Sequence, residues 1–190
     1  MPARLVVLAS GAGSTLQAVL DAAAEDSLGG EVVAVGSDRP GCRALKRAAA
    51  AGVPAFVRAL ADFPDRAAWT ADLTEAIAAH QPDLVVCAGF MRVLAPAVVR
   101  RFRIVNTHPS LLPAFPGAHA VRDALAAGVP TSGVTIHWVD EGVDTGPVLA
   151  QAPVEVRPDD DEDSLRARIQ AVEKPLYVET IRRLLKELPP

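Results

Sequence analysis

The sequence predicts an α/β fold: a single domain with a mostly parallel twisted sheet, helices on both faces and an antiparallel C-terminal extension. Short apolar runs alternate with longer helical stretches, which is the pattern of strands and helices in a parallel sheet. Continuous β-branched runs such as Leu5–Leu8 are typical of strands covered on both faces. The last two apolar runs have no helical stretch between them, so we expect them to pair antiparallel. The predicted arrangement is Rossmann-like.

The expected elements follow from these patterns in chain order. The short apolar runs give the strands Arg4–Leu8, Val32–Val35, Ala55–Val57, Leu84–Cys87, Ile104–Asn106, Gly133–Val139 and Val148–Val156. The longer stretches give the helices Thr15–Ala24, Arg43–Ala51, Asp65–Ala79, Pro96–Arg101, Ala118–Ala127 and Asp163–Leu185. The acidic run Asp159–Asp163 opens the last helix, where the helix dipole favours carboxylates. A cation site is the alternative interpretation of that run.

Length and composition limit the classes of function. A chain of 190 residues is long enough for one domain with its own core. The net charge of −4 at pH 7 provides no overall basic field for a polyanion, which argues against RNA or DNA as the substrate. We expect Cys87 to be a buried unreactive thiol and Cys42 an ordinary one, so the cytoplasm, a reducing compartment, is the predicted location. The apolar run Leu5–Ala9 is too short for a signal peptide or a membrane span.

The segment Ile104–Pro113 carries the most informative polar residues. Its apolar run ends in Asn106 and His108, and residues two apart in a strand face the same side, so these two are expected to converge on one reacting atom. An amide beside an imidazole suits chemistry at a carbonyl, where negative charge develops on oxygen. A carboxylate on another loop, such as Asp144, is expected to orient the imidazole and favour its charged form. The alternative is a strand end whose polar side chains are satisfied locally.

A glycine-rich loop, Ser10–Thr15, links the first strand to the first helix. Its free backbone N–H groups and the helix dipole predict an anion site. Leu16 occupies the third glycine position of the dinucleotide fingerprint, and the Gly-Lys-Ser/Thr of a P-loop is missing. The loop therefore suits a mononucleotide-like monophosphate better than NAD or ATP, and a tight turn without a ligand is the alternative.

Several motifs together resemble a known family. The run Asn106-x-His108-Pro109-Ser110-Leu111-Leu112-Pro113, followed by Asp140-x-Gly142-x-Asp144-x-Gly146-Pro147, resembles the signature of formyltransferases that use 10-formyltetrahydrofolate. Within that superfamily, Ser10–Gln17 and Ala88–Leu94 resemble the members that formylate glycinamide ribonucleotide (GAR) in purine biosynthesis. The resemblance extends from Leu5 to about Leu185.

The resemblance implies a formyltransferase domain over residues 1–190, with a phosphate-binding part at about 1–100 and a folate and catalytic part at about 85–190. The substrate amine would be the nucleophile, so Ser110 would be a turn residue. The implied catalytic residues are Asn106, His108 and Asp144. The implied GAR and phosphate contacts are Gly11, Ala12, Gly13, Ser14, Thr15 and Glu173, although Ala12 and Thr15 stand where the family commonly has asparagines. The implied folate contacts are Arg66, Met91, Arg92, Val93, Leu94, Asn106, Val139, Asp140 and Asp144.

Several different functions stay open at this point. A methionyl-tRNA formyltransferase would need an RNA-binding domain and a basic surface, and a formyltetrahydrofolate hydrolase would need a regulatory domain; the sequence shows neither. A formyltransferase for another amine stays possible, as does a non-catalytic folate- or nucleotide-binding module. No metal or nicotinamide is expected, since His80, His119 and His137 lack zinc spacing, and His137 is expected to be a satisfied buried imidazole. The expected partners are small molecules, and neither nucleic acid nor a membrane is expected to bind. The expected oligomeric state is a monomer or a homodimer.

Overall fold

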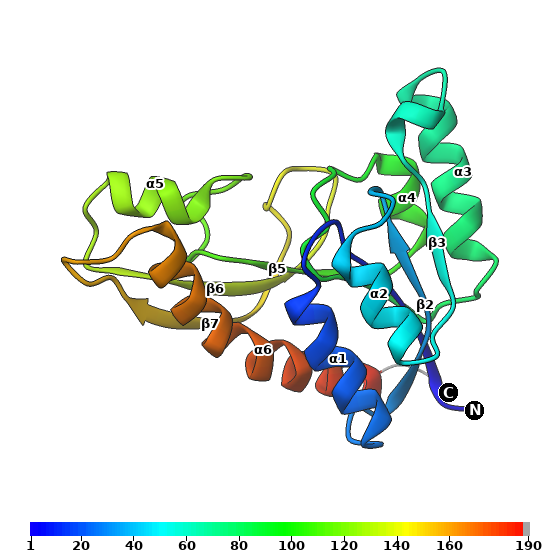
Figure 1. The fold of residues 1–190 in the computed structure, drawn as a ribbon, viewed down its shortest axis with the longest axis horizontal. Helices are drawn as coiled ribbons and strands as arrows, with labels where there is room; N and C mark the ends of the chain where they lie inside the picture. The colour runs from blue at the N-terminus through cyan, green and yellow to red at the C-terminus, as the bar shows by residue number, and fades with distance from the viewer. Residues whose placement is uncertain (188–190) are drawn as a thin grey trace.

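The computed structural model describes residues 1–187, which contain one sheet built from β1 (Ala3–Leu8), β2 (Gly30–Ser37), β3 (Ala55–Val57), β4 (Leu84–Cys87), β5 (Ile104–His108), β6 (Thr131–Trp138) and β7 (Val148–Glu155). The strand order is β3-β2-β1-β4-β5-β6-β7. Figure 1 shows β2 and β3 on one side of the molecule and β6 and β7 on the other. Strands β1 to β5 pair in parallel, whereas β6 pairs antiparallel with both β5 and β7. The predicted fold class is confirmed, including its antiparallel extension.

The helices are α1 (Ser14–Ala24), α2 (Arg43–Ala50), α3 (Arg66–Ala78), α4 (Pro96–Arg101), α5 (Ala120–Ala126) and α6 (Glu162–Lys186), with a 3-10 turn η1 (Leu60–Asp62). Every predicted helix and strand is present, and its bounds agree with the prediction to within about two residues. The 3-10 turn was not predicted. In α6, the Asp161 side chain accepts from the Ser164 backbone N–H, so the acidic run caps a helix as expected.

The packing of strand β1 explains why the run Leu5–Leu8 is apolar at every position. Leu5 and Val7 pack in a core with α1, α2 and α6, whereas Val6 and Leu8 pack in a second core with α3 and α4. All four side chains are fully buried. Successive side chains of a strand point to opposite faces, so a strand with helices on both sides needs an uninterrupted apolar run.

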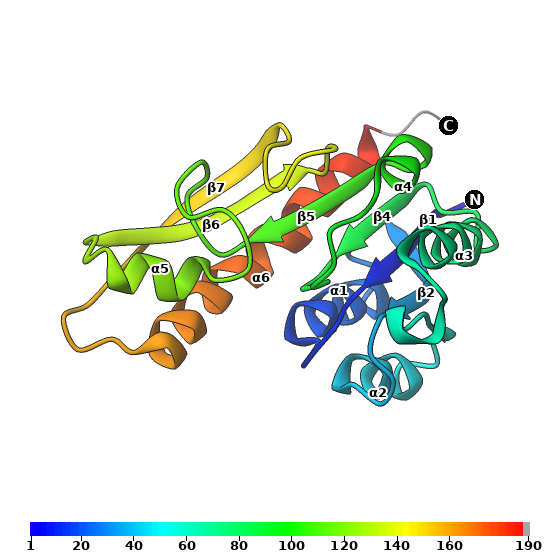
Figure 2. The same cartoon turned by 90° about the horizontal axis from the view of Figure 1, so that it is seen from above.

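Helix α6 ties the two halves of the sheet together. It lies beside α1 and runs along β6 and β7 (Figure 1), and with α5 it closes the far end of the sheet around a small core (Figure 2). The Tyr177 hydroxyl donates to the carbonyls of Cys87 at 2.9 Å and Val105 at 3.0 Å. These contacts fix α6 against β4 and β5. Cys87 is buried, as predicted, and burial raises the pKa of its thiol to about 12.

The parallel strands β1, β2, β4 and β5 end at one edge of the sheet, and the loops that follow them meet there. In open α/β sheets this is the edge at which ligands bind. None of the helices within residues 1–187 combines the length and apolarity needed to cross a membrane.

Candidate active site

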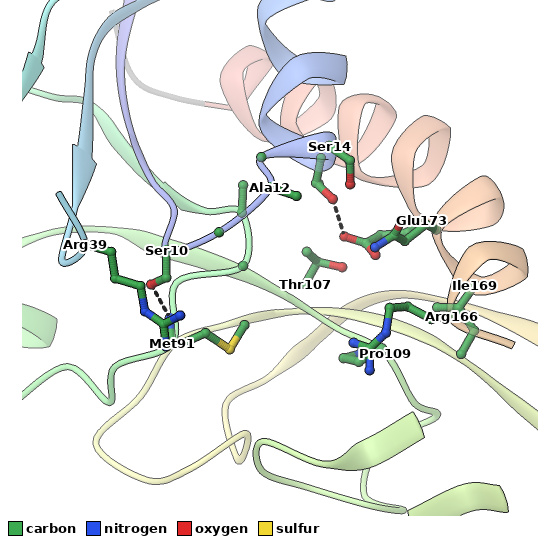
Figure 3. A pocket seen from close by; sticks show the side chains of 16 residues that line it. Ser10, Ala12, Ser14, Arg39, Met91, Thr107, Pro109, Arg166, Ile169 and Glu173 are labelled. Atoms are coloured by element: carbon green, nitrogen blue, oxygen red, sulfur yellow. Dashed lines mark hydrogen bonds between the residues drawn. The ribbon is translucent and has the colours of Figure 1, made fainter. Parts of the chain in front are cut away.

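A first pocket of about 330 Å³ lies between the glycine loop, the loop after β4 and α6 (Figure 3). All six residues predicted to contact the GAR phosphate and ribose line it: Gly11, Ala12, Gly13, Ser14, Thr15 and Glu173. The fold thus brings together two segments that are about 160 positions apart. Their contact with a ligand stays a prediction.

The glycine loop has the backbone geometry that an anion site requires. Gly13 is the N-cap of α1 with φ +68°, and no side chain caps the helix. The first N–H groups of α1 therefore lack side-chain partners and are available to a ligand anion. A Cβ on Gly13 would lie 2.8 Å from the Cα of Ala44, so a side chain is excluded both by the positive φ and by the neighbouring backbone.

Two arginines that we did not predict also line the first pocket. Arg39 follows β2 and Arg166 lies on α6, and Figure 3 shows them on opposite sides of the pocket. They add positive charge to a site already suited to an anion. On α6, Arg166, Ile169 and Glu173 lie on one helical face, a spacing visible in the sequence. The family resemblance placed Glu173 of this face at the GAR site, but the sequence did not reveal that Arg166 and Ile169 line the same pocket.

Glu173 is an acidic group held in a largely buried position. Its Oε1 accepts a hydrogen bond from the Thr15 hydroxyl at 2.9 Å, and only 8% of the residue is exposed. Burial raises the pKa of Glu173 above its ordinary value, against the opposing effect of the Thr15 hydrogen bond. Thr15, where the family commonly has asparagine, thus positions an acid at the floor of the pocket.

Strand β5 separates this pocket from the catalytic residues. Thr107 lines the first pocket, whereas Asn106 lines a second pocket on the other side. The Asn106 Nδ2 lies 3.1 Å from the Nε2 of His137, which is its partner in the β5–β6 register. His137 Nδ1 donates to the Trp138 carbonyl at 2.9 Å, so in the neutral ring Nε2 accepts from Asn106.

His137 was expected to be a satisfied buried imidazole, and it is one, but it is also a partner of Asn106. Burial lowers the pKa of His137, against the hydrogen bond to Trp138 and the charge of Asp144. A neutral His137 holds one amide hydrogen of Asn106 and leaves the other free. The sequence alone could not reveal this contact, because it depends on the antiparallel register of β5 with β6.

His108 and Asp144 meet as predicted. Asp144 Oδ2 lies 3.4 Å from His108 Nδ1, and its Oδ1 lies 3.7 Å from His137 Nε2. The other ring nitrogen of His108, Nε2, lies 2.8 Å from the carbonyl oxygen of Phe115. Asp144 also accepts from the Gly117 N–H at 2.8 Å, which fixes the carboxylate. Asn106, His108 and Asp144 therefore form one cluster, linked through His137.

Two neighbours of His108 hold an unusual backbone conformation. Phe115 and Asp144 have φ values of 53° and 55°, in the left-handed region that non-glycine residues rarely adopt. Such residues cost about 1–3 kcal/mol each and persist only where the surrounding structure determines them. Strain on both sides of one imidazole is typical of a functional site.

The second pocket has a volume of about 70 Å³ and contains most of the predicted folate contacts. Arg92, Val93, Leu94, Asn106, Val139 and Asp140 line it. Pockets for small molecules usually occupy about 300–1,000 Å³, so the second pocket is smaller than a typical ligand site. Val93 and Val143 are about half exposed, which is consistent with a surface that a ligand covers.

Three predicted folate contacts lie elsewhere. Met91 lines the first pocket, whereas its neighbours Phe90 and Arg92 line the second. Asp144 lines neither pocket and contacts the two histidines instead. Arg66 begins α3 in a groove beside α4, but its guanidinium donates to the Val93 carbonyl at 2.6 Å, so it lies next to the second pocket. Among residues 1–187, no group of three or more His, Cys, Asp or Glu side chains has the geometry of a metal site.

The comparisons with known proteins agree with this geometry. The chain belongs to the formyl transferase family, whose match spans residues 3–181. Within that family it is similar to the phosphoribosylglycinamide formyltransferase of Mycobacterium tuberculosis strain H37Rv, with 57% identity over 96% of this chain and 85% of the relative. The Escherichia coli K12 enzyme of the same name is 42% identical over 91% of this chain and 82% of the relative.

A solved structure shows the same likeness in three dimensions. Glycinamide ribonucleotide transformylase 1 from Symbiobacterium toebii superposes with a TM-score of 0.95 at 45% sequence identity. The match covers 98% of this chain and 89% of that chain. The fold is therefore shared over nearly the whole length of the chain.

Gly13→Ala should weaken binding of GAR at least tenfold and binding of tetrahydrofolate much less. The added Cβ meets the backbone of Ala44 and resists the positive φ, so the N–H groups of the loop lose their alignment; a hydrogen bond to a charged group contributes about 1.5–3 kcal/mol. Separate calorimetric titrations measure the two affinities. Gly52→Ala is the control for folding, since Gly52 also has a positive φ of 70° but lines neither the first nor the second pocket. Equal weakening of both ligands would contradict the assignment of this loop.

Glu173→Gln should raise the melting temperature at pH 8 more than at pH 5. The folded-state pKa of Glu173 is raised above its unfolded value of 4.5, so the carboxyl opposes folding increasingly as the pH rises above that value. Glutamine removes this effect and keeps an acceptor for Thr15. Thermal unfolding at both pH values measures the difference. A gain in melting temperature that is the same at both would show that Glu173 is not destabilised as a carboxylate.

Proposed function

We propose that the protein transfers the formyl group of 10-formyltetrahydrofolate to the amine of GAR, giving formyl-GAR and tetrahydrofolate in de novo purine biosynthesis. The observation that carries the proposal is the position of Asn106: its side chain lines the second pocket and belongs to the His137–Asp144–His108 cluster. Thr107, its neighbour on β5, lines the pocket suited to a phosphate. A donor at the boundary between two substrate sites is what group transfer requires.

The reaction forms a bond from the GAR amine to the formyl carbon, breaks the bond from that carbon to N10 of the folate, and moves one proton from the amine to N10. The glycine loop, Arg39 and Arg166 bind the phosphate and place the amine beside β5. Residues Arg92–Leu94 and Val139–Asp140 hold the pterin ring in the second pocket. The substrate amine is the nucleophile, so the protein supplies positioning, charge stabilisation and proton transfer.

Each residue of the cluster has a role in this step. Asn106 donates its free amide hydrogen to the formyl oxygen as negative charge develops there. His108 stabilises the same charge once it exchanges its bond to the Phe115 carbonyl for one to the substrate. Asp144 orients His108 and helps to transfer the proton, directly or through water.

The proposed partners are small molecules only, and the proposed location is the cytoplasm. The net charge of −4 supplies no general attraction for nucleic acid. The unpaired cysteines Cys42 and Cys87 are compatible with a reducing compartment.

A spectroscopic assay of tetrahydrofolate formation tests the proposal. The purified protein is supplied with 10-formyltetrahydrofolate and, in separate reactions, with GAR, with glycinamide, with tRNA or with water alone. We expect turnover with GAR only. Turnover with water alone would make the protein a hydrolase, turnover with another amine would change the acceptor, and binding of both ligands without turnover would make it a binding module.

Asn106→Ala and His108→Ala should each lower kcat by about 10²–10³, since that is the usual effect of removing one donor to a developing oxyanion. The KM values should change far less, because these donors act mainly in the transition state. Steady-state kinetics with GAR and 10-formyltetrahydrofolate measure both constants. Near-normal kcat in either variant would remove that residue from the catalytic mechanism.

Asp144→Asn should lower kcat by at least tenfold while both substrates still bind. The amide can still accept from Gly117, but it carries no charge to face His108 Nδ1. Circular dichroism and titration with each substrate confirm that the variant is folded. Full activity in a folded Asp144→Asn enzyme would show that the negative charge is not needed.

A further inference from the structure

A buried carboxylate joins three loops at the edge of the sheet. Asp38 directly follows β2, and its side chain is fully buried. Its Oδ1 accepts from the Ser10 hydroxyl at 2.5 Å, and its Oδ2 accepts from Arg92 Nε at 2.6 Å. The Ser10 hydroxyl in turn accepts from the Met91 N–H at 2.8 Å. Met91 and Arg92 are adjacent in the chain, so these hydrogen bonds form a closed ring through Asp38, Ser10, Met91 and Arg92, the Asp38 ring.

That loop, residues 88–94, is the dividing loop between the two pockets. Ala88, Gly89 and Met91 line the first pocket, whereas Phe90, Arg92, Val93 and Leu94 line the second. Ser10 also lines the first pocket, so the ring has two members in the first pocket, Ser10 and Met91, and one in the second, Arg92. Any ligand that fills either pocket touches the dividing loop.

Packing alone does not fix the dividing loop. Met91 is 58% exposed and Val93 is 51% exposed, so neither apolar side chain is held by the core. Gly89 has φ +78°, and a Cβ there would meet only the end of the Met91 side chain at 4.0 Å. Leu94 is buried and anchors the far end of the loop. Phe90 packs against the second core, the Ser10 N–H donates to the Gly89 carbonyl at 3.0 Å and Arg66 donates to the Val93 carbonyl. The Asp38 ring adds the side-chain contacts that hold Met91 and Arg92 at the middle of the loop.

We infer that Asp38 is a positioning residue that couples the two substrate sites, so that occupation of one pocket changes the affinity of the other. The inference rests on the proposed function. A ligand against Met91 in the first pocket orders the dividing loop, and the ring transmits that order to Arg92 in the second. Charge-assisted hydrogen bonds at both carboxylate oxygens make the connection stiff.

Calorimetric titration of GAR, with and without saturating tetrahydrofolate, tests the inference. This pair contains no formyl group, so no turnover occurs during the measurement. In the wild-type protein we expect tetrahydrofolate to change the Kd of GAR by about fivefold or more. In Asp38→Asn, where an amide faces the Arg92 donor, the ratio should fall to about 1, with each ligand alone binding within about threefold of wild type.

Ser10→Ala breaks the ring at its other side and leaves the Asp38–Arg92 contact intact. In this variant too, the ratio of the GAR Kd values with and without tetrahydrofolate should fall to about 1, even if GAR alone binds less well. If Asp38→Asn does not fold, Ser10→Ala decides the question.

Asp160→Asn is the matched control. The Asp160 side chain is 2% exposed and pairs with Arg168 at 2.6 Å, and neither residue lines the first or the second pocket. This variant should lose stability but keep the wild-type coupling ratio. A merely structural role of Asp38 would give the two variants the same behaviour.

Three results would overturn the inference: no coupling in the wild-type protein, unchanged coupling in folded Asp38→Asn and Ser10→Ala, or equal loss of coupling in Asp160→Asn. Each of these leaves the proposed function standing, because both ligands still bind the wild-type protein. Failure of GAR or tetrahydrofolate to bind the wild-type protein would instead overturn the proposed function and the coupling with it.

Discussion

The alternation of side chains along β5 is the constraint on which the whole site depends. Asn106 and Thr107 are neighbours in the chain, yet one lines the second pocket and the other lines the first. Because successive side chains point to opposite faces, two ligands can bind on the two sides of β5 and remain only one strand apart. Their reacting groups can then meet at the end of that strand. This works only while β5 keeps its position, and that position is fixed by β4, β6 and the Tyr177 hydroxyl of α6.

The sequence predicted the features that are local or periodic. Apolar runs located every strand, and the spacing of Asn106 and His108 located the catalytic edge, because a period of two is a property of the strand itself. The glycine loop was recognisable because only glycine suits the φ of Gly13. The resemblance to a family supplied what periodicity could not, namely that Asp144 and Glu173 reach this edge from distant parts of the chain.

The features that the sequence did not reveal all depend on register or on buried contacts between loops. The pairing of Asn106 with His137 requires the antiparallel register of β5 and β6. Met91 lines the first pocket while its neighbours Phe90 and Arg92 line the second, an arrangement that depends on the backbone of the turn at Gly89. Asp38 gave no signal, since an acidic residue after a strand is usually solvated. Its role became visible only once the Ser10 and Arg92 contacts were known.

Several residues of the site have conformations or environments that disfavour folding, and this explains the position of the site in the fold. Phe115 and Asp144 hold left-handed φ values, and Glu173 is a carboxyl in a buried place. Each of these features lowers the stability of the folded state, by about 1–3 kcal/mol for a strained residue. They are tolerated because they lie at the end of a sheet whose strands are covered by helices on both faces, where the apolar cores determine the backbone. The same rigidity holds His108 between two acceptors and Asn106 against His137, so the groups that meet the substrate are oriented before it arrives.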